Sequence, residues 1–265
     1  MKAKLKSIGI VLVFGVTMVN CTSMKSPMQK SIDHQGVEYI TEGIGSPTIV
    51  FETGMGPTID TWDKILDSLS KHTQVYAYNR PGYGKSGLKN APRNVIEVAE
   101  QLHTNLSANN IKPPYVLVGH SAGGLYVNMF ARLYPEETVG IVFVDASHPE
   151  QFEYFKTDQK FLYNMLLTST QKGKRTYEYD IVKTTSESFR NAPKFPEVPI
   201  TVLTAGKSSP LENKNIRKKW LEFQVELSNL SSKSKHLVVE ESGHYIHRNE
   251  PNIAIEEILR ILKTK

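Results

Sequence analysis

Short apolar runs alternate with amphipathic segments along most of the chain from Ser31 onward. Short continuous apolar runs are typical of strands buried on both faces of a sheet, and apolar residues spaced three and four apart indicate helices. The pattern predicts a hairpin over 32–40, strands over 48–51, 74–78, 115–118, 139–144, 200–203 and 237–239, and helices over 61–69, 94–106, 123–134, 211–230 and 252–262. Such alternation predicts an α/β fold, a mostly parallel central sheet with helices on both faces.

One long segment, about 148–198, interrupts this alternation before the last two predicted strands. It shows no clear strand, and its helix-like polar sequence carries aromatic residues such as Phe152, Phe155 and Phe161. Long insertions between sheet strands are often functional covers. We therefore expect a helical lid inserted into a single domain that spans 31–265.

The first residues have the pattern of a targeting signal. Lys2, Lys4 and Lys6 precede an apolar run over 7–19, which is too short for a comfortable membrane span and typical of a signal-peptide core. We expect a signal peptide over 1–20 and a polar tether over 21–30. Fold reasoning therefore begins after these segments.

The only cysteine, Cys21, directly follows the apolar run. Its position resembles the lipid-attachment site of bacterial lipoproteins, although Val19 and Asn20 depart from the small residues that are usual there. The resemblance implies an extracytoplasmic protein anchored to the membrane through lipid on Cys21. A secreted or periplasmic protein with an incidental free thiol, or an uncleaved anchor, is the alternative.

Composition narrows the class of protein further. The chain has 265 residues, 39% of them hydrophobic and 22% charged, which suits one globular domain. The formal net charge is +5, but Lys2, Lys4 and Lys6 lie in the segment expected to be removed. No aromatic-basic repeat or base-reading motif accompanies the remaining cations, so we expect no nucleic-acid partner.

The segment Gly119-His120-Ser121-Ala122-Gly123 matches the pattern G-x-S-x-G between a predicted strand and a predicted helix. A serine on such a sharp turn needs neighbours almost without side chains, and Gly119 and Gly123 provide them. Ser121 is the candidate nucleophile. The plain alternative is a glycine-rich turn with an idle serine.

From about residue 31 the chain resembles the α/β-hydrolase family, and the elbow at Ser121 is the motif that carries the resemblance. The segment 78–86 is similar to the family loop D-R-P-G-x-G-x-S, with Asn79 in place of the usual Asp. We interpret this loop, including Arg80 and Ser86, as one that shapes the site without taking part in the chemistry. The resemblance implies the α/β-hydrolase fold.

A serine nucleophile needs a base, and the family places it after the last strand. His244 follows Gly243 just after the predicted strand 237–239 and is the candidate base. We interpret His247 as a lid or helix-cap contact, and His120 as a packing residue.

The acid is less clearly marked, because the usual family position after strand 200–203 has no carboxylate before Glu212. Asp145 ends the strand 139–144 and resembles the acid of haloalkane-dehalogenase-like members. Asp145 is therefore the candidate that would orient His244. Glu212 is the alternative acid, and Asp145 could instead cap a helix or anchor the lid.

Acyl transfer also needs N–H donors that face the developing oxyanion. The resemblance assigns one to the backbone of Ala122, directly after the nucleophile. The second would be the Met55 N–H in the loop 52–57, where Gly54 and Gly56 flank Met55. A plain glycine turn is the alternative for this loop.

Together these residues predict a serine hydrolase that cleaves a carboxylic ester, or a related acyl compound, through an acyl-enzyme. An amidase, peptidase or carbon–carbon bond hydrolase could use the same triad. The alternative from another class of protein is a non-catalytic surface lipoprotein that binds a ligand. We expect a small-molecule acyl substrate. The sequence shows no metal-ligand spacing and no dinucleotide fingerprint, so we expect no metal and no cofactor.

Overall fold

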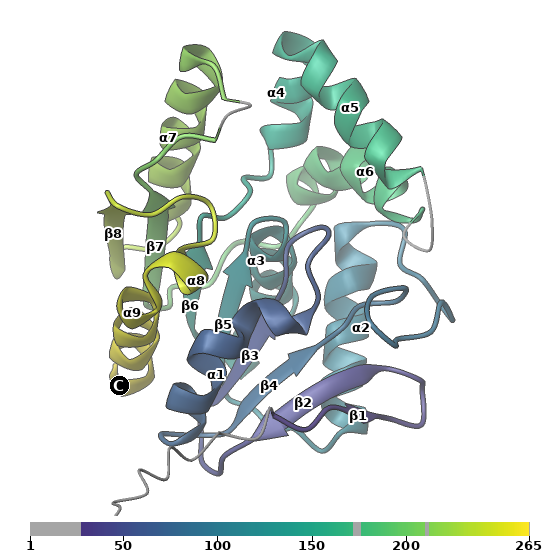
Figure 1. Ribbon diagram of the computed structural model, residues 1–265, viewed down its shortest axis with the longest axis vertical. Coiled ribbons are helices and arrows are strands. Elements are labelled where there is room, and N and C mark those ends of the chain that lie inside the picture. Colours follow the sequence, from purple (N-terminus) through teal and green to yellow (C-terminus); the bar gives the residue numbers. More distant parts are fainter. Residues whose placement is uncertain (1–27, 172–175, 210–211, 265) are drawn as a thin grey trace, which may run out of the picture.

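A computed structural model describes residues 28–171, 176–209 and 212–264. The predicted signal peptide, Cys21 and most of the predicted tether lie outside the described residues. The sheet has eight strands in the order β1-β2-β4-β3-β5-β6-β7-β8 (Figure 1). The strands are β1 Ser31–Ile32, β2 Glu38–Glu42, β3 Thr48–Glu52, β4 Val75–Tyr78, β5 Tyr115–His120, β6 Thr138–Val144, β7 Ile200–Ala205 and β8 Ser234–Val239.

The six strands β3 to β8 are mutually parallel, whereas β1 and β2 form an antiparallel hairpin at one edge. Every residue of β3, β4, β5 and β7 is buried, as the continuous apolar runs predict for a sheet covered on both faces. The edge strand β8 is largely exposed or half-buried. The predicted fold class, a mostly parallel α/β sheet, is confirmed.

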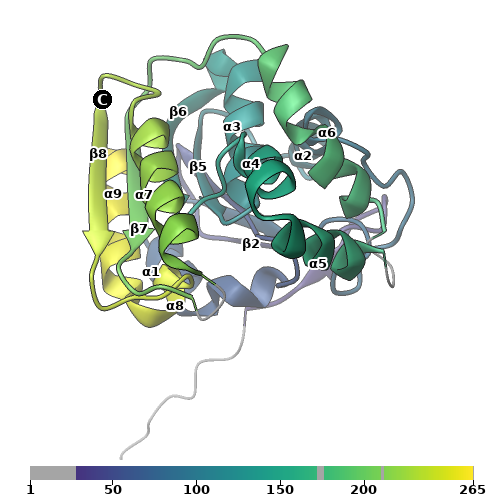
Figure 2. The same ribbon diagram turned by 90° about the horizontal axis from the view of Figure 1, so that it is seen from above.

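Helices cover both faces of the sheet (Figures 1 and 2). One apolar cluster joins the sheet to α1, α8 and α9, and a second joins it to α2, α3 and α7. The helices in these two layers are α1 Asp63–Ser70, α2 Val95–Ala108, α3 Gly123–Leu133, α7 Lys214–Ser228, α8 Ile246–Asn249 and α9 Pro251–Lys263. Two short 3-10 helices are η1 Ile59–Trp62 and η2 Pro135–Glu137.

Three further helices lie between β6 and β7, in the segment where the sequence predicts an insertion. They are α4 Gln151–Asp158, α5 Lys160–Thr170 and α6 Glu178–Arg190. Figure 1 shows them together at one end of the sheet, above α3. We call α4, α5 and α6 the inserted helices.

Two predicted helices differ in detail from the structure. The range 61–69 begins inside the 3-10 turn η1 and becomes α-helical at Asp63. The long helix expected from 211 begins only at Lys214, because the side chain of Asn213 accepts the Ile216 N–H and caps it there.

Candidate active site

Ser121 lies on a sharp turn between β5 and α3, with a φ of +54°. Such a φ is uncommon for a residue with a side chain, and it marks stored backbone strain. Gly123 makes the turn possible, because a Cβ at this position would lie 2.2 Å from the carbonyl oxygen of Glu52. The turn also leaves the first residues of α3 without a side-chain cap, so their N–H groups add partial positive charge beside Ser121.

Backbone hydrogen bonds hold this turn against the end of β6. The Ser121 N–H donates to the Val144 carbonyl at 3.2 Å, and the Ser121 carbonyl accepts the Ser147 N–H at 2.9 Å. Asp145 lies between these two contacts, also at a positive φ of 41°. The fold therefore brings the serine turn and the aspartate turn side by side.

Asp145 and His244 are 99 positions apart in the sequence, yet their side chains meet. His244 Nδ1 lies 2.7 Å from Asp145 Oδ2. The carboxylate is nearly buried, at 5% exposed, whereas the imidazole is 37% exposed. Because a carboxylate accepts, Nδ1 donates the hydrogen, and in this tautomer Nε2 carries the lone pair that can accept a proton.

The second oxygen of Asp145 is occupied as well. Oδ1 accepts the backbone N–H of Ala205, at the end of β7, and the indole N–H of Trp220 from α7, each at 3.0 Å. The Ala205 donor lies at the end of β7, the strand after which the sequence has no carboxylate before Glu212, and the Trp220 donor comes from the helix that follows. Nothing in the sequence pattern singled out Trp220 or Ala205.

His120, interpreted from sequence as a packing residue, also makes a specific contact. It is buried, and its Nε2 donates to the backbone carbonyl of His244 at 3.0 Å. Burial, together with the charges of His244 and His247, holds the pKa of His120 well below its usual range. A neutral His120 thus anchors the loop of His244 to the residue before Ser121.

Two further histidines, His247 and His148, make other contacts. His247 is buried, with Nε2 2.8 Å from Thr61 Oγ1 and its ring against Trp62, so it packs on η1. His148 Nε2 lies 3.3 Å from a Glu226 carboxylate oxygen.

Glu212, the alternative acid, accepts the Ser209 N–H at 3.2 Å and lies 4.0 Å from Arg217. Its carboxylate is thus engaged in the loop before α7. The carboxylate that His244 contacts is that of Asp145.

The loop 53–56 approaches Ser121 closely. A Cβ on Gly54 would lie 2.9 Å from Cβ of Ser121, so only glycine fits there. Within the described residues, neither the Met55 N–H nor the Ala122 N–H donates a hydrogen bond to the protein. Two backbone donors are therefore available beside the serine.

A cavity of about 420 Å³ opens over this site. Ser121, Ala122 and Met55 line its floor. Its walls are mainly apolar side chains of α4 and α5, namely Phe152, Phe155, Leu162, Met165 and Leu166. The cavity suits a substrate with an apolar group of modest size.

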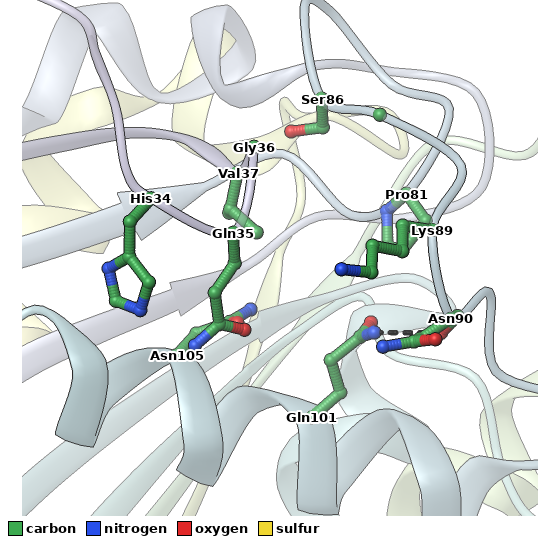
Figure 3. A pocket seen from close by; sticks show the side chains of 11 residues that line it. His34, Gln35, Gly36, Val37, Pro81, Ser86, Lys89, Asn90, Gln101 and Asn105 are labelled. Atoms are coloured by element: carbon green, nitrogen blue, oxygen red, sulfur yellow. Dashed lines mark hydrogen bonds between the residues drawn. The ribbon is translucent and has the colours of Figure 1, made fainter.

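A second cavity, of about 290 Å³, lies away from Ser121, among the turn 34–37, the loop 81–90 and α2 (Figure 3). Ser86 lines it, but the Ser86 hydroxyl donates to the Asn79 carbonyl and accepts the Glu38 N–H. This serine is thus fixed as a structural link between β2 and the loop after β4. In the described ranges, no group of three or more His, Cys, Asp or Glu side chains is placed to hold a metal ion.

Comparisons with known proteins bear on the fold of the chain. Residues 47–171 match the family described as alpha/beta hydrolase fold. The uncharacterized protein YqjL of Bacillus subtilis is 26% identical over 238 residues, which cover 87% of this chain and 90% of YqjL.

Solved structures with the same architecture include a candidate lipase from Acinetobacter baumannii AYE, with a TM-score of 0.67, 20% identity and coverage of 89% of this chain and 91% of that chain. An alpha/beta superfamily hydrolase from Oenococcus oeni PSU-1 has a TM-score of 0.65, 17% identity and coverage of 89% and 100%. Identities this low show the fold alone.

The chain therefore has the α/β-hydrolase fold. The family model matches residues 47–171, slightly less than half of the chain.

Proposed function

We propose that the protein is a serine hydrolase that cleaves a carboxylic ester or a related acyl compound. The observation that carries the proposal is the His244–Asp145 hydrogen bond of 2.7 Å, formed beside a serine held at a positive φ. A base oriented by a buried acid next to a strained serine is the arrangement that activates a hydroxyl.

In this proposal Ser121 Oγ attacks the acyl carbon while His244 Nε2 takes its proton. Asp145 keeps the Nδ1 hydrogen in place and stabilises the imidazolium that forms. The N–H groups of Met55 and Ala122 donate to the oxyanion, and each such donor contributes roughly 3 kcal/mol to transition-state stabilisation. His244 then protonates the leaving group. Water next attacks the acyl carbon while His244 takes its proton, and His244 returns that proton to Ser121 Oγ as the bond between Oγ and the acyl carbon breaks.

Hydrolysis of p-nitrophenyl esters from acetate to palmitate tests the proposal. The wild type is expected to release p-nitrophenol, and Ser121→Ala is expected to lose about 10⁴-fold or more in kcat, because the nucleophile is gone. Ser107→Ala, on the exposed face of α2, is a matched control that should keep full activity. Equal rates for wild type and Ser121→Ala would contradict the serine mechanism.

The inserted helices are proposed to be a lid, because α4 and α5 supply the apolar walls of the cavity over Ser121. The length of acyl chain that the wild type prefers would then report the depth of this cavity.

We also propose that the protein is an extracytoplasmic lipoprotein attached to a membrane through Cys21. Lys2, Lys4, Lys6 and the apolar run before Cys21 support this placement. The described residues contain no helix that is both long and apolar enough to span a bilayer.

A further inference from the structure

Arg80, in the loop after β4, is completely buried. Its guanidinium lies over the rings of Tyr83 and Tyr126, with the central carbon 4.8 Å from each ring centroid. A buried cation is costly unless it is paired and hydrogen-bonded. The groups that pair with Arg80 therefore show which parts of the structure the buried cation stabilises.

These partners are the loop 53–56 and two carboxylates. Nη1 donates to Glu52 at 2.9 Å and to the Thr53 carbonyl at 2.7 Å, and Nη2 donates to the Gly54 carbonyl at 2.8 Å. Burial raises the pKa of Glu52, and the neighbouring Arg80 cation opposes that rise. Glu178, in the first turn of α6, places a carboxylate oxygen 3.7 Å from Nη2.

The bond to the Gly54 carbonyl has a consequence for the site. The Gly54 C=O and the Met55 N–H belong to one planar peptide group and point in opposite directions. A cation that binds the oxygen fixes the direction of the N–H and draws electron density from it, which strengthens the N–H as a donor.

Tyr83 ties the other side of the same loop to α6. Its hydroxyl accepts the Gly56 N–H at 3.0 Å and donates to Glu178. Glu178 is 1% exposed, and it belongs to one of the inserted helices that lie over the site. Both peptides that flank Met55 are thus linked to Glu178, one through Arg80 and one through Tyr83.

We propose that Arg80 is a positioning residue that orients and polarises the Gly54–Met55 peptide, and that Glu178 makes this orientation depend on the docking of α6. The inference rests on the proposed function in assigning the Met55 N–H to the oxyanion. It adds that the inserted helices set the strength of this donor as well as covering the cavity.

The test substitutes Glu178 and Tyr83, because removing Arg80 would leave Glu52 buried without its cation and would threaten folding. Glu178→Ala and Tyr83→Phe break the link to α6, and Glu178→Gln restores the acceptor for the Tyr83 hydroxyl. Asp180→Ala, an exposed carboxylate two positions along the same helix, is the control.

Ester kinetics should show a fall in kcat of about tenfold for Glu178→Ala and Tyr83→Phe, with KM within about twofold, because a misdirected donor weakens transition-state binding selectively. Glu178→Gln should recover most of kcat, and Asp180→Ala should match the wild type. Thermal unfolding identifies any variant that has lost its fold.

Hydrogen–deuterium exchange of the Gly56 amide gives a readout that needs no activity. Exchange should be faster in Glu178→Ala than in wild type or Asp180→Ala. The inference is overturned if both Glu178→Ala and Tyr83→Phe keep the wild-type kcat and the wild-type exchange rate of the Gly56 amide. Where Glu178→Ala does not fold, the same result for Tyr83→Phe alone overturns it. A wild type inactive on esters but with the expected exchange changes would refute the ester function and support the loop coupling.

Discussion

Trp220→Phe isolates the support that α7 gives to Asp145. The substitution keeps a flat apolar ring in α7 but deletes the indole N–H that donates to Asp145 Oδ1 at 3.0 Å. The Ala205 N–H, also at 3.0 Å, remains as the only other donor to that oxygen within the described residues.

A hydrogen bond to a charged group contributes about 1.5–3 kcal/mol, which corresponds to about 10- to 150-fold in rate if the whole amount is lost in the transition state. Because one donor remains, we expect the low end, a fall in kcat of about tenfold with little change in KM. Without the Trp220 donor, the Asp145 carboxylate would be held less firmly and would therefore orient the Nδ1–H of His244 less well.

The assay is steady-state ester hydrolysis, with urea unfolding to confirm that the variant is folded. Trp62→Phe makes the same chemical change at a buried indole whose N–H has no partner among the described residues, and it should keep kcat within about twofold. A folded Trp220→Phe protein with wild-type kcat would refute the reasoning.

Two further predictions concern acid stability and membrane attachment. Burial lowers the pKa of His247 to about 3, so below its usual pKa of about 6.5 the unfolded chain takes up a proton that the folded protein does not. This contribution to stability is complete above pH 6.5 and is lost as the pH falls toward 3; wild type should lose about 2 kcal/mol more than His247→Gln between pH 7 and pH 5 in urea unfolding. Equal losses in the two proteins would show that His247 does not carry the effect. Cys21→Ser should abolish labelling by radioactive palmitate and move the protein from the membrane fraction to the soluble fraction, and a soluble wild type would argue against the lipid anchor.

Sequence reasoning was most successful where structure is decided locally. The short apolar runs at 48–51 and 115–118 became β3 and β5, because a continuous apolar strand is stable only when both faces are covered. The elbow at Ser121 could also be recognised from the chain, because its glycines are required by contacts within a few residues or with the adjacent strand. The predicted ends of helices were less exact. At α7, for example, the capping side chain of Asn213 decides where the first turn begins.

The contacts around the candidate site depend on the meeting of distant loops. Sequence reasoning named Asp145 and His244 as candidates, but their hydrogen bond exists because parallel strands bring their carboxyl ends to one edge of the sheet. The Trp220 donor, 75 positions from Asp145, had no signal in the sequence.

The same holds for Arg80. Its motif marked a loop that shapes the site, but only the folded chain places its cation on the Gly54 carbonyl and its neighbour Tyr83 on Glu178. Periodicity and glycine spacing record short-range sterics and burial, so the sequence by itself determined the α/β architecture and the serine turn. Which buried charges and donors face one another was decided by tertiary structure, since those pairings depend on the packing of segments that are far apart along the chain.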